Sequence, residues 1–237
     1  MVLTEQQLFD YITCPALYDV KHNKNIPIGE PISMTKLLEK VSKYFYVSLF
    51  NGKVPSSNEL KKKWDSICQQ YEQYVDAKKN IEGMGFIMKL LQWAADEQIM
   101  VADIDTKYNQ VFRAGNGYVE IEGHIGTVLA LSNDRFELLF TDFSNRMPDQ
   151  TLIDMKLKYS LDCLAFNQTY GKSVSGVRIR NVKNAKDFLT FRSQDDFNRL
   201  KQTVLNVSSC IEQKLYYPRE SLLCANCNAK DYCKAWG

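Results

Sequence analysis

The sequence predicts an α/β protein of the α+β type, with a helical first part, a central sheet flanked by helices, and a cysteine-rich tail. Three observations predict it. Apolar residues recur at helical spacing through the first hundred residues, and alternating apolar and polar segments begin near Val111. The tail segment from Cys224 to Cys233 places three thiols at C-x2-C-x5-C spacing, which is typical of a structural metal or iron–sulfur site.

The first part is expected to contain four helices. Thr4 caps a short one through Tyr11, which ends near Pro15. Residues 34–50 form the second, with apolar side chains spaced for one face: Leu37, Leu38, Val41, Phe45 and Leu49. Ser57 caps a third helix that reaches about Lys79, and the fourth runs from about Glu82 to Glu97.

The second part is expected to form strands with two helices among them. Residues 111–131 alternate around Ala114-Gly115-Asn116-Gly117, which is typical of a hairpin turn. The elements that follow are a strand at 136–143, a helix opened by Pro148 and Asp149, a strand at 174–182, and a helix from Ser193 to about Lys214. We divide the chain into a helical part (1–100), a sheet core (101–215) and a tail (216–237) that together form one compact unit.

Composition limits the function classes. The net charge of +2 over 237 residues gives no global basic field for nucleic acid. A nucleic-acid surface would need local clusters, such as Lys61-Lys62-Lys63 or the pair Arg178 and Arg180. No apolar run approaches the roughly 18 residues of a membrane span. The first residues lack a basic region followed by an apolar stretch, so we do not expect them to act as a signal peptide. Seven unevenly placed cysteines favour a reducing, cytoplasmic location over a disulfide framework.

The tail cysteines need a fourth ligand, and Cys14 is the best candidate because it precedes Pro15 in a rigid turn. Cys14, Cys224, Cys227 and Cys233 would complete an all-thiolate shell. The spacing alone does not separate zinc from an iron–sulfur cluster. The other cysteines lie within helical apolar patterns and are expected in the core: Cys68, Cys163 and Cys210.

Both ends of the chain resemble a known family. The segments from Leu8 to Tyr18 and from Tyr216 to Cys233 are similar to RecB-like PD-(D/E)XK nucleases with a C-terminal iron–sulfur cluster, such as those of CRISPR adaptation and the AddB type. The resemblance implies a restriction-endonuclease-like core with a mixed sheet. It also implies that one upstream and three downstream cysteines hold a [4Fe–4S] cluster.

The family's catalytic motifs are incomplete in this chain. The family has Gly-x-x-Asp, then Asp or Glu followed by x and Lys, then Gln-x-x-x-Tyr, with Mg²⁺ or Mn²⁺ on the two carboxylates. The first motif aligns on Gly123 with Gly126 at the aspartate position. Asp142 is kept, but Ser144 and Met155 stand where lysine and glutamine are expected, before Tyr159. One carboxylate alone binds a hard dication poorly, so the resemblance favours an inactivated nuclease.

An alternative keeps the catalysis with migrated residues. Glu122 and His124 share a strand face with Gly126, so either could join Asp142 at a metal, while Lys156 or Lys158 replaces the lysine. The simpler interpretation makes Glu122 and His124 ordinary sheet residues and Asp142 a loop cap.

Three functions therefore remain open. The first is a non-catalytic nucleic-acid-binding or scaffold subunit of a replication, recombination or transcription complex, with DNA favoured. The second is an active Mg²⁺- or Mn²⁺-dependent deoxyribonuclease, and the third is a purely protein-binding subunit.

Overall fold

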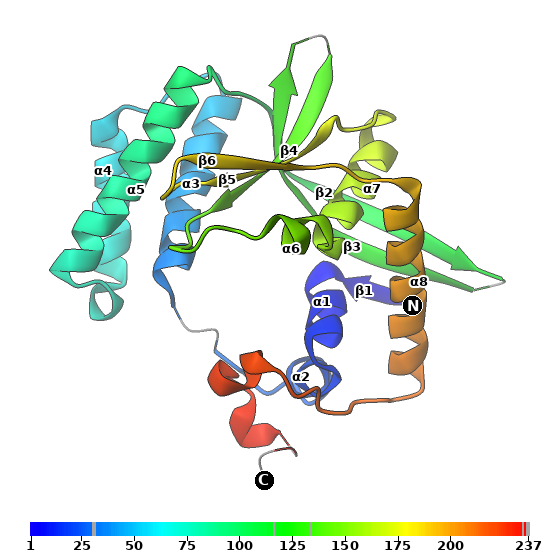
Figure 1. Ribbon diagram of the computed structural model, residues 1–237. Helices are drawn as coiled ribbons and strands as arrows, with labels where there is room; N and C mark the ends of the chain where they lie inside the picture. The colour runs from blue at the N-terminus through cyan, green and yellow to red at the C-terminus, as the bar shows by residue number, and fades with distance from the viewer. Residues whose placement is uncertain (30–31, 116, 133, 234, 236–237) are drawn as a thin grey trace. The chain divides into compact units, whose positions relative to one another are not determined.

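The computed structural model describes residues 1–29, 32–115, 117–132, 134–233 and 235. It is a mixed α/β fold with an open sheet flanked by helices (Figure 1). The chain separates into two compact units. The first comprises Met1–Pro31, Lys107–His124 and Gln194–Gly237, and the second comprises Ile32–Thr106 and Ile125–Ser193.

The sheet contains both parallel and antiparallel pairs, as predicted. Its strands are β1 (Val2–Thr4), β2 (Met100–Ala114), β3 (Gly117–Leu131), β4 (Arg135–Asp142), β5 (Gly176–Asn181) and β6 (Lys186–Thr190). Their order is β1-β3-β4-β5-β6, with β2 also paired to β3. The β3–β4 and β5–β6 pairs are antiparallel, and the β1–β3 and β4–β5 pairs are parallel.

In the first unit, α1 (Glu5–Thr13) and α2 (Pro15–Tyr18) follow β1, and a π-helical turn spans Asp19–Asn23. Thr4 caps α1 as predicted, in a capping box with Gln7. α8 (Gln194–Glu212) contacts α1 and leads to the tail, whose 3₁₀ turns span Leu222–Asn226 and Lys230–Tyr232. The N-terminal segment and the tail therefore belong to the same unit.

In the second unit, helices cover both faces of the strands. α3 (Met34–Phe50), α4 (Ser57–Gln70) and α5 (Ala77–Asp96) share one core with Leu129 and Leu139. The opposite face of β4 packs on α7 (Leu157–Tyr170), where the ring of Phe140 lies 4.6 Å from that of Tyr159. The short α6 (Gln150–Asp154) precedes α7 and contacts β6.

Several boundaries differ from the prediction. α4 ends at Gln70 rather than near Lys79, because Asp76 caps a new helix by accepting from the Lys79 amide. The helix that begins after the Asp149 cap is broken at Met155, so α6 and α7 are separate. β2 begins at Met100, and the short strands β1 and β6 were not predicted. In the expected hairpin turn, Asn116 lies outside the described residues.

Candidate functional site

The four predicted cysteine ligands line one cavity of the first unit. Cys14 comes from the turn between α1 and α2, and Cys224, Cys227 and Cys233 come from the tail. The cavity has a volume of about 330 Å³. Two segments about two hundred residues apart in sequence thus supply thiols to a single concave surface.

Direct hydrogen bonds hold the tail against the N-terminal segment. The Ala16 amide donates to the Tyr217 carbonyl at 3.1 Å, and the Tyr11 hydroxyl donates to the Leu215 carbonyl at 2.6 Å. The Arg219 guanidinium donates to the Ile12 carbonyl at 2.7 Å. These bonds fix the backbone on either side of Cys14 relative to the start of the cysteine tail.

An aromatic cluster packs beneath this junction. The Tyr18 ring stacks on Tyr216 at 5.9 Å and meets Tyr11 edge-on at 5.5 Å. Burial raises the pKa of the Tyr18 hydroxyl above its usual value. Such packing stabilises the approach of the two segments before any ligand is bound.

Backbone amides point at two of the thiols. The Arg219 amide donates to the Cys14 sulfur at 3.4 Å, and the Ser221 amide donates to the Cys224 sulfur at 3.4 Å. Hydrogen bonds to the ligand sulfurs are a common feature of thiolate-bound clusters. The donor set therefore fits a thiolate-ligated group. Within the described part of the chain, no three His, Cys, Asp or Glu side chains meet closely enough to hold one ion.

The remaining cysteines lie outside this cavity. Cys163 is buried in α7, as predicted for a core residue. Cys68 and Cys210 are only partly buried. Burial raises the pKa of the Cys68 thiol, so it stays protonated at neutral pH.

A second site surrounds Asp142 at the end of β4. One carboxylate oxygen accepts from the Ser144 amide at 2.8 Å. The other accepts from the Ser144 hydroxyl at 3.0 Å and from the Asn181 side chain at 2.7 Å. Asn181 is fully buried, and its amide nitrogen also lies 3.3 Å from the Ser144 carbonyl. Asp142 therefore ties the loop after β4 to β5, as the loop-cap interpretation expects.

Asp142 also faces a cavity of about 430 Å³ whose lining includes Lys156, Tyr159 and Glu39. Burial, followed by the negative charge of Asp142, raises the pKa of Tyr159 to about 12. Burial also raises the pKa of Glu39. Sequence reasoning missed Glu39, because it lies on α3, far along the chain from the motif.

Other candidate residues of the second unit already have partners. Lys158 forms a 2.6 Å ion pair with the fully buried Asp162. The Lys156 ammonium lies 5.1 Å from the centre of the Tyr159 ring. Arg178 pairs with Glu137 and Asp187, and Arg180 pairs with Asp187. The two arginines thus stabilise the sheet and do not form the exposed basic cluster considered from sequence.

Glu122 and His124 lie exposed on one face of β3, with Ile121 and Ile125 buried on the other. They line a cavity of the first unit with Glu5, which accepts from the Tyr108 hydroxyl at 3.0 Å. Asp142 belongs to the second unit. A metal site shared by these residues and Asp142 stays a prediction.

Comparisons with known proteins add little. No family model matches the chain, and no curated protein does. The crystal structure of SSO0001 aligns with a TM-score of 0.43 at 12% sequence identity, over 85% of this chain and 96% of that one. A similarity at this level carries no argument about fold or function. Among the described residues, no helix has the length and apolar character needed to cross a membrane.

Proposed function

We propose that this protein is a catalytically degenerate RecB-like nuclease-fold protein that holds a [4Fe–4S] cluster and serves as a nucleic-acid-binding or scaffold subunit of a DNA-processing complex. The restriction-endonuclease-like arrangement of the core is part of the proposal. Cys14, Cys224, Cys227 and Cys233 would hold the cluster. Its chemistry is structural: four thiolate bonds join the two ends of the chain.

The observation that carries this proposal is the gathering of all four predicted thiols around one cavity. In a cluster the four thiolates bind different iron atoms, so they surround a body larger than a single ion. Zinc would instead need four sulfurs at about 2.3 Å from one point. A cavity with thiols on its walls suits the larger group better, and zinc remains the chemical alternative.

The bonding of Asp142 supports the absence of catalysis. Both of its oxygens accept hydrogen bonds from Ser144 or Asn181. A metal would have to compete with these donors, and Ser144 occupies the position from which a lysine would activate water. The carboxylate therefore has a structural use that does not require a dication.

Metal analysis of anaerobically purified protein tests the cluster. We expect about four irons and four sulfides per chain and a brown colour. Stoichiometric zinc without iron would overturn the iron assignment. Retention of full iron content in Cys14→Ser would overturn the ligand set.

The second candidate is an Mg²⁺- or Mn²⁺-dependent deoxyribonuclease. It is favoured by the cavity beside Asp142, which Lys156 and Glu39 also line. Degradation of end-labelled single- and double-stranded DNA with either metal, lost in Asp142→Ala, would establish it in place of the inactive protein.

A further inference from the structure

The helical hairpin of α3 and α4 has a larger net positive charge than the whole chain. Residues 34–70 include seven lysines and three carboxylates, a net charge of +4, whereas the whole chain has +2. The rest of the sequence is therefore net negative. Such charge asymmetry within a near-neutral protein indicates a local surface for an anionic partner.

The lysines lie on the outer sides of the two helices. Leu37 and Val41 of α3 and Trp64 of α4 are buried in the core. Lys40 and Lys63 are exposed, as are the neighbouring Lys61 and Lys62. On α3, the basic positions recur at 36, 40 and 43, which places them along one side of the helix.

Two of these lysines lie over aromatic rings of the partner helix segment. The Lys40 ammonium is 4.5 Å from the centre of the Tyr71 ring and donates to its hydroxyl at 2.6 Å. The Lys63 ammonium lies 5.7 Å from the centre of the Tyr44 ring. Both tyrosines are only partly buried. The hairpin thus presents flat rings and exposed cations together.

These contacts are easily exchanged. An exposed cation–π contact contributes about 0.5–1 kcal/mol, whereas stacking of a nucleic-acid base on an aromatic ring contributes about 1–3 kcal/mol. A base can therefore displace the ammonium from the ring, and the released lysine can contact the adjacent phosphate. An acidic protein segment would use the lysines but would have no use for the rings.

We propose that the hairpin of α3 and α4 binds single-stranded nucleic acid, with Lys40, Lys63 and the Lys61-Lys62 pair on phosphates and Tyr44 and Tyr71 stacking on bases. This inference rests on the proposed function and names the surface that performs it. Binding does not depend on the nucleotide sequence, because every base offers a stacking face and every nucleotide a phosphate.

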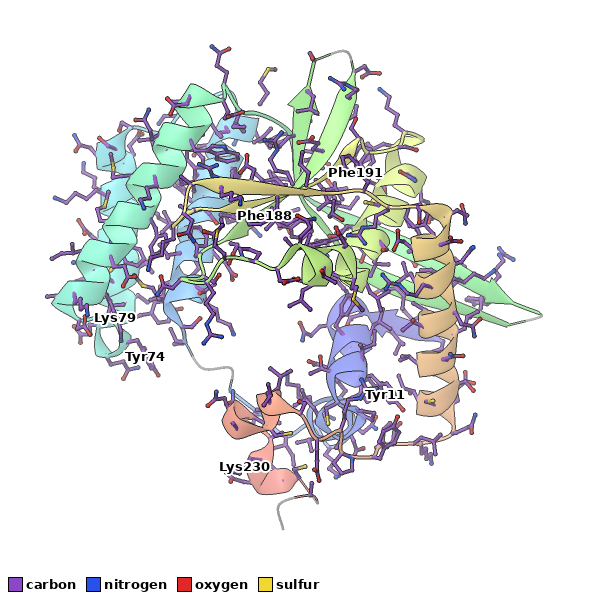
Figure 2. All side chains as sticks on the ribbon, viewed as in Figure 1. Tyr11, Tyr74, Lys79, Phe188, Phe191 and Lys230 are labelled. Carbon is purple, nitrogen blue, oxygen red and sulfur yellow. The ribbon has the colours of Figure 1, made fainter. Side chains whose placement is uncertain are left out.

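The test measures binding of the full chain to a labelled single-stranded oligothymidine by fluorescence anisotropy across a salt series. In Lys40→Ala/Lys63→Ala, we expect affinity at low salt to fall on the order of tenfold and the slope of log K against log salt to become shallower by about 1.4. The matched control is Lys186→Ala/Lys201→Ala. It removes the same charge, and Lys186 also lies over a ring, 5.3 Å from the centre of Phe188 (labelled in Figure 2). The control should bind like the parent.

A second variant tests the rings. Tyr44→Leu/Tyr71→Leu should weaken binding with the salt slope unchanged, because it removes stacking and no charge. Its circular dichroism melting curve shows whether the hairpin remains folded.

Equal losses in the lysine variant and its control would overturn the proposed surface, because binding would then follow net charge. Competition by polyglutamate as strong as by DNA, with the tyrosine variant unaffected, would assign the surface to an acidic protein instead. A parent that binds no DNA would overturn both this surface and the nucleic-acid role. The iron content of the protein would still test the proposed cluster independently of DNA binding.

Discussion

The cysteine cavity of the first unit and the Asp142 pocket of the second differ in what their reactive groups already contact. The Cys14 and Cys224 sulfurs accept from backbone amides at 3.4 Å, an ordinary distance for a sulfur acceptor. The Asp142 oxygens accept three hydrogen bonds, two from Ser144 and one from the buried side chain of Asn181. The thiols are positioned for a ligand, whereas the carboxylate has become part of the loop that it holds.

Under the proposed function, the two sites would differ in what each contributes to the fold. A site that joins distant segments contributes to folding whenever its group is bound, so it is retained even without catalysis. A catalytic carboxylate without its metal must find other partners, since a half-buried charge lacking hydrogen bonds is costly. Asn181 and Ser144 supply them here.

The largest expected effect is the loss of a cysteine ligand. Cys233→Ser should abolish most of the iron and lower the free energy of unfolding by about 4–5 kcal/mol, by analogy with a disulfide that closes a long loop. Iron content and urea unfolding measure the two effects. Cys68→Ser is the matched control, since Cys68 is also partly buried but lies on α4 in the other unit. Equal behaviour of the two variants would contradict the ligand assignment.

Next in size is the loss of the Asp142 network. Asp142→Ala leaves the buried Asn181 amide without its shortest bond, so we expect a loss of about 1–3 kcal/mol in urea unfolding. DNA cleavage should be absent in the parent and in the variant. The control is Asp134→Asn, which removes the charge of an exposed ion pair with Lys172 and keeps a residue type that tolerates the positive φ at this position. It should change stability by less than about 0.5 kcal/mol. An Asp142 variant as stable as this control would mean that the network contributes nothing.

A further test restores to the Asp142 site the catalytic residues that the nuclease family has at positions 126 and 144. A Cβ added at Gly126 meets no atom within 4 Å, so Gly126→Asp should fold normally. Ser144→Lys removes one donor from Asp142 and should cost about 1 kcal/mol. In the double variant, two carboxylates would be available, and Mn²⁺ should raise the melting temperature. An equal rise in the parent would show that Asp142 binds metal without the restored residues.

The sequence predicted local features well and long-range ones poorly. Thr4 and Asp149 act as helix caps because capping depends on neighbours in the chain. Leu37, Leu38 and Val41 are buried together, as their spacing indicated. β1 and β6 were missed because three and five residues are too short for alternation to be recognised. Glu39 and Asn181 were missed because they reach the Asp142 region only through tertiary packing.

The last effect is absent at neutral pH and concerns Tyr159, whose raised pKa reports on the Asp142 pocket. An unfolded tyrosine ionises near pH 10, whereas folded Tyr159 ionises near pH 12. Between these values the unfolded state releases a proton that the folded state keeps, so stability falls as pH rises. By pH 11 this contribution reaches about 1.4 kcal/mol, and Tyr159→Phe should remove it. Urea unfolding at pH 7 and pH 11 measures the difference between parent and variant.

Asp142→Asn should reduce that difference without abolishing it, because burial is the larger cause of the pKa shift of Tyr159 and the Asp142 charge is the second. The same alkaline loss in parent and Tyr159→Phe would show that the pocket beside Asp142 is more hydrated than its packing indicates.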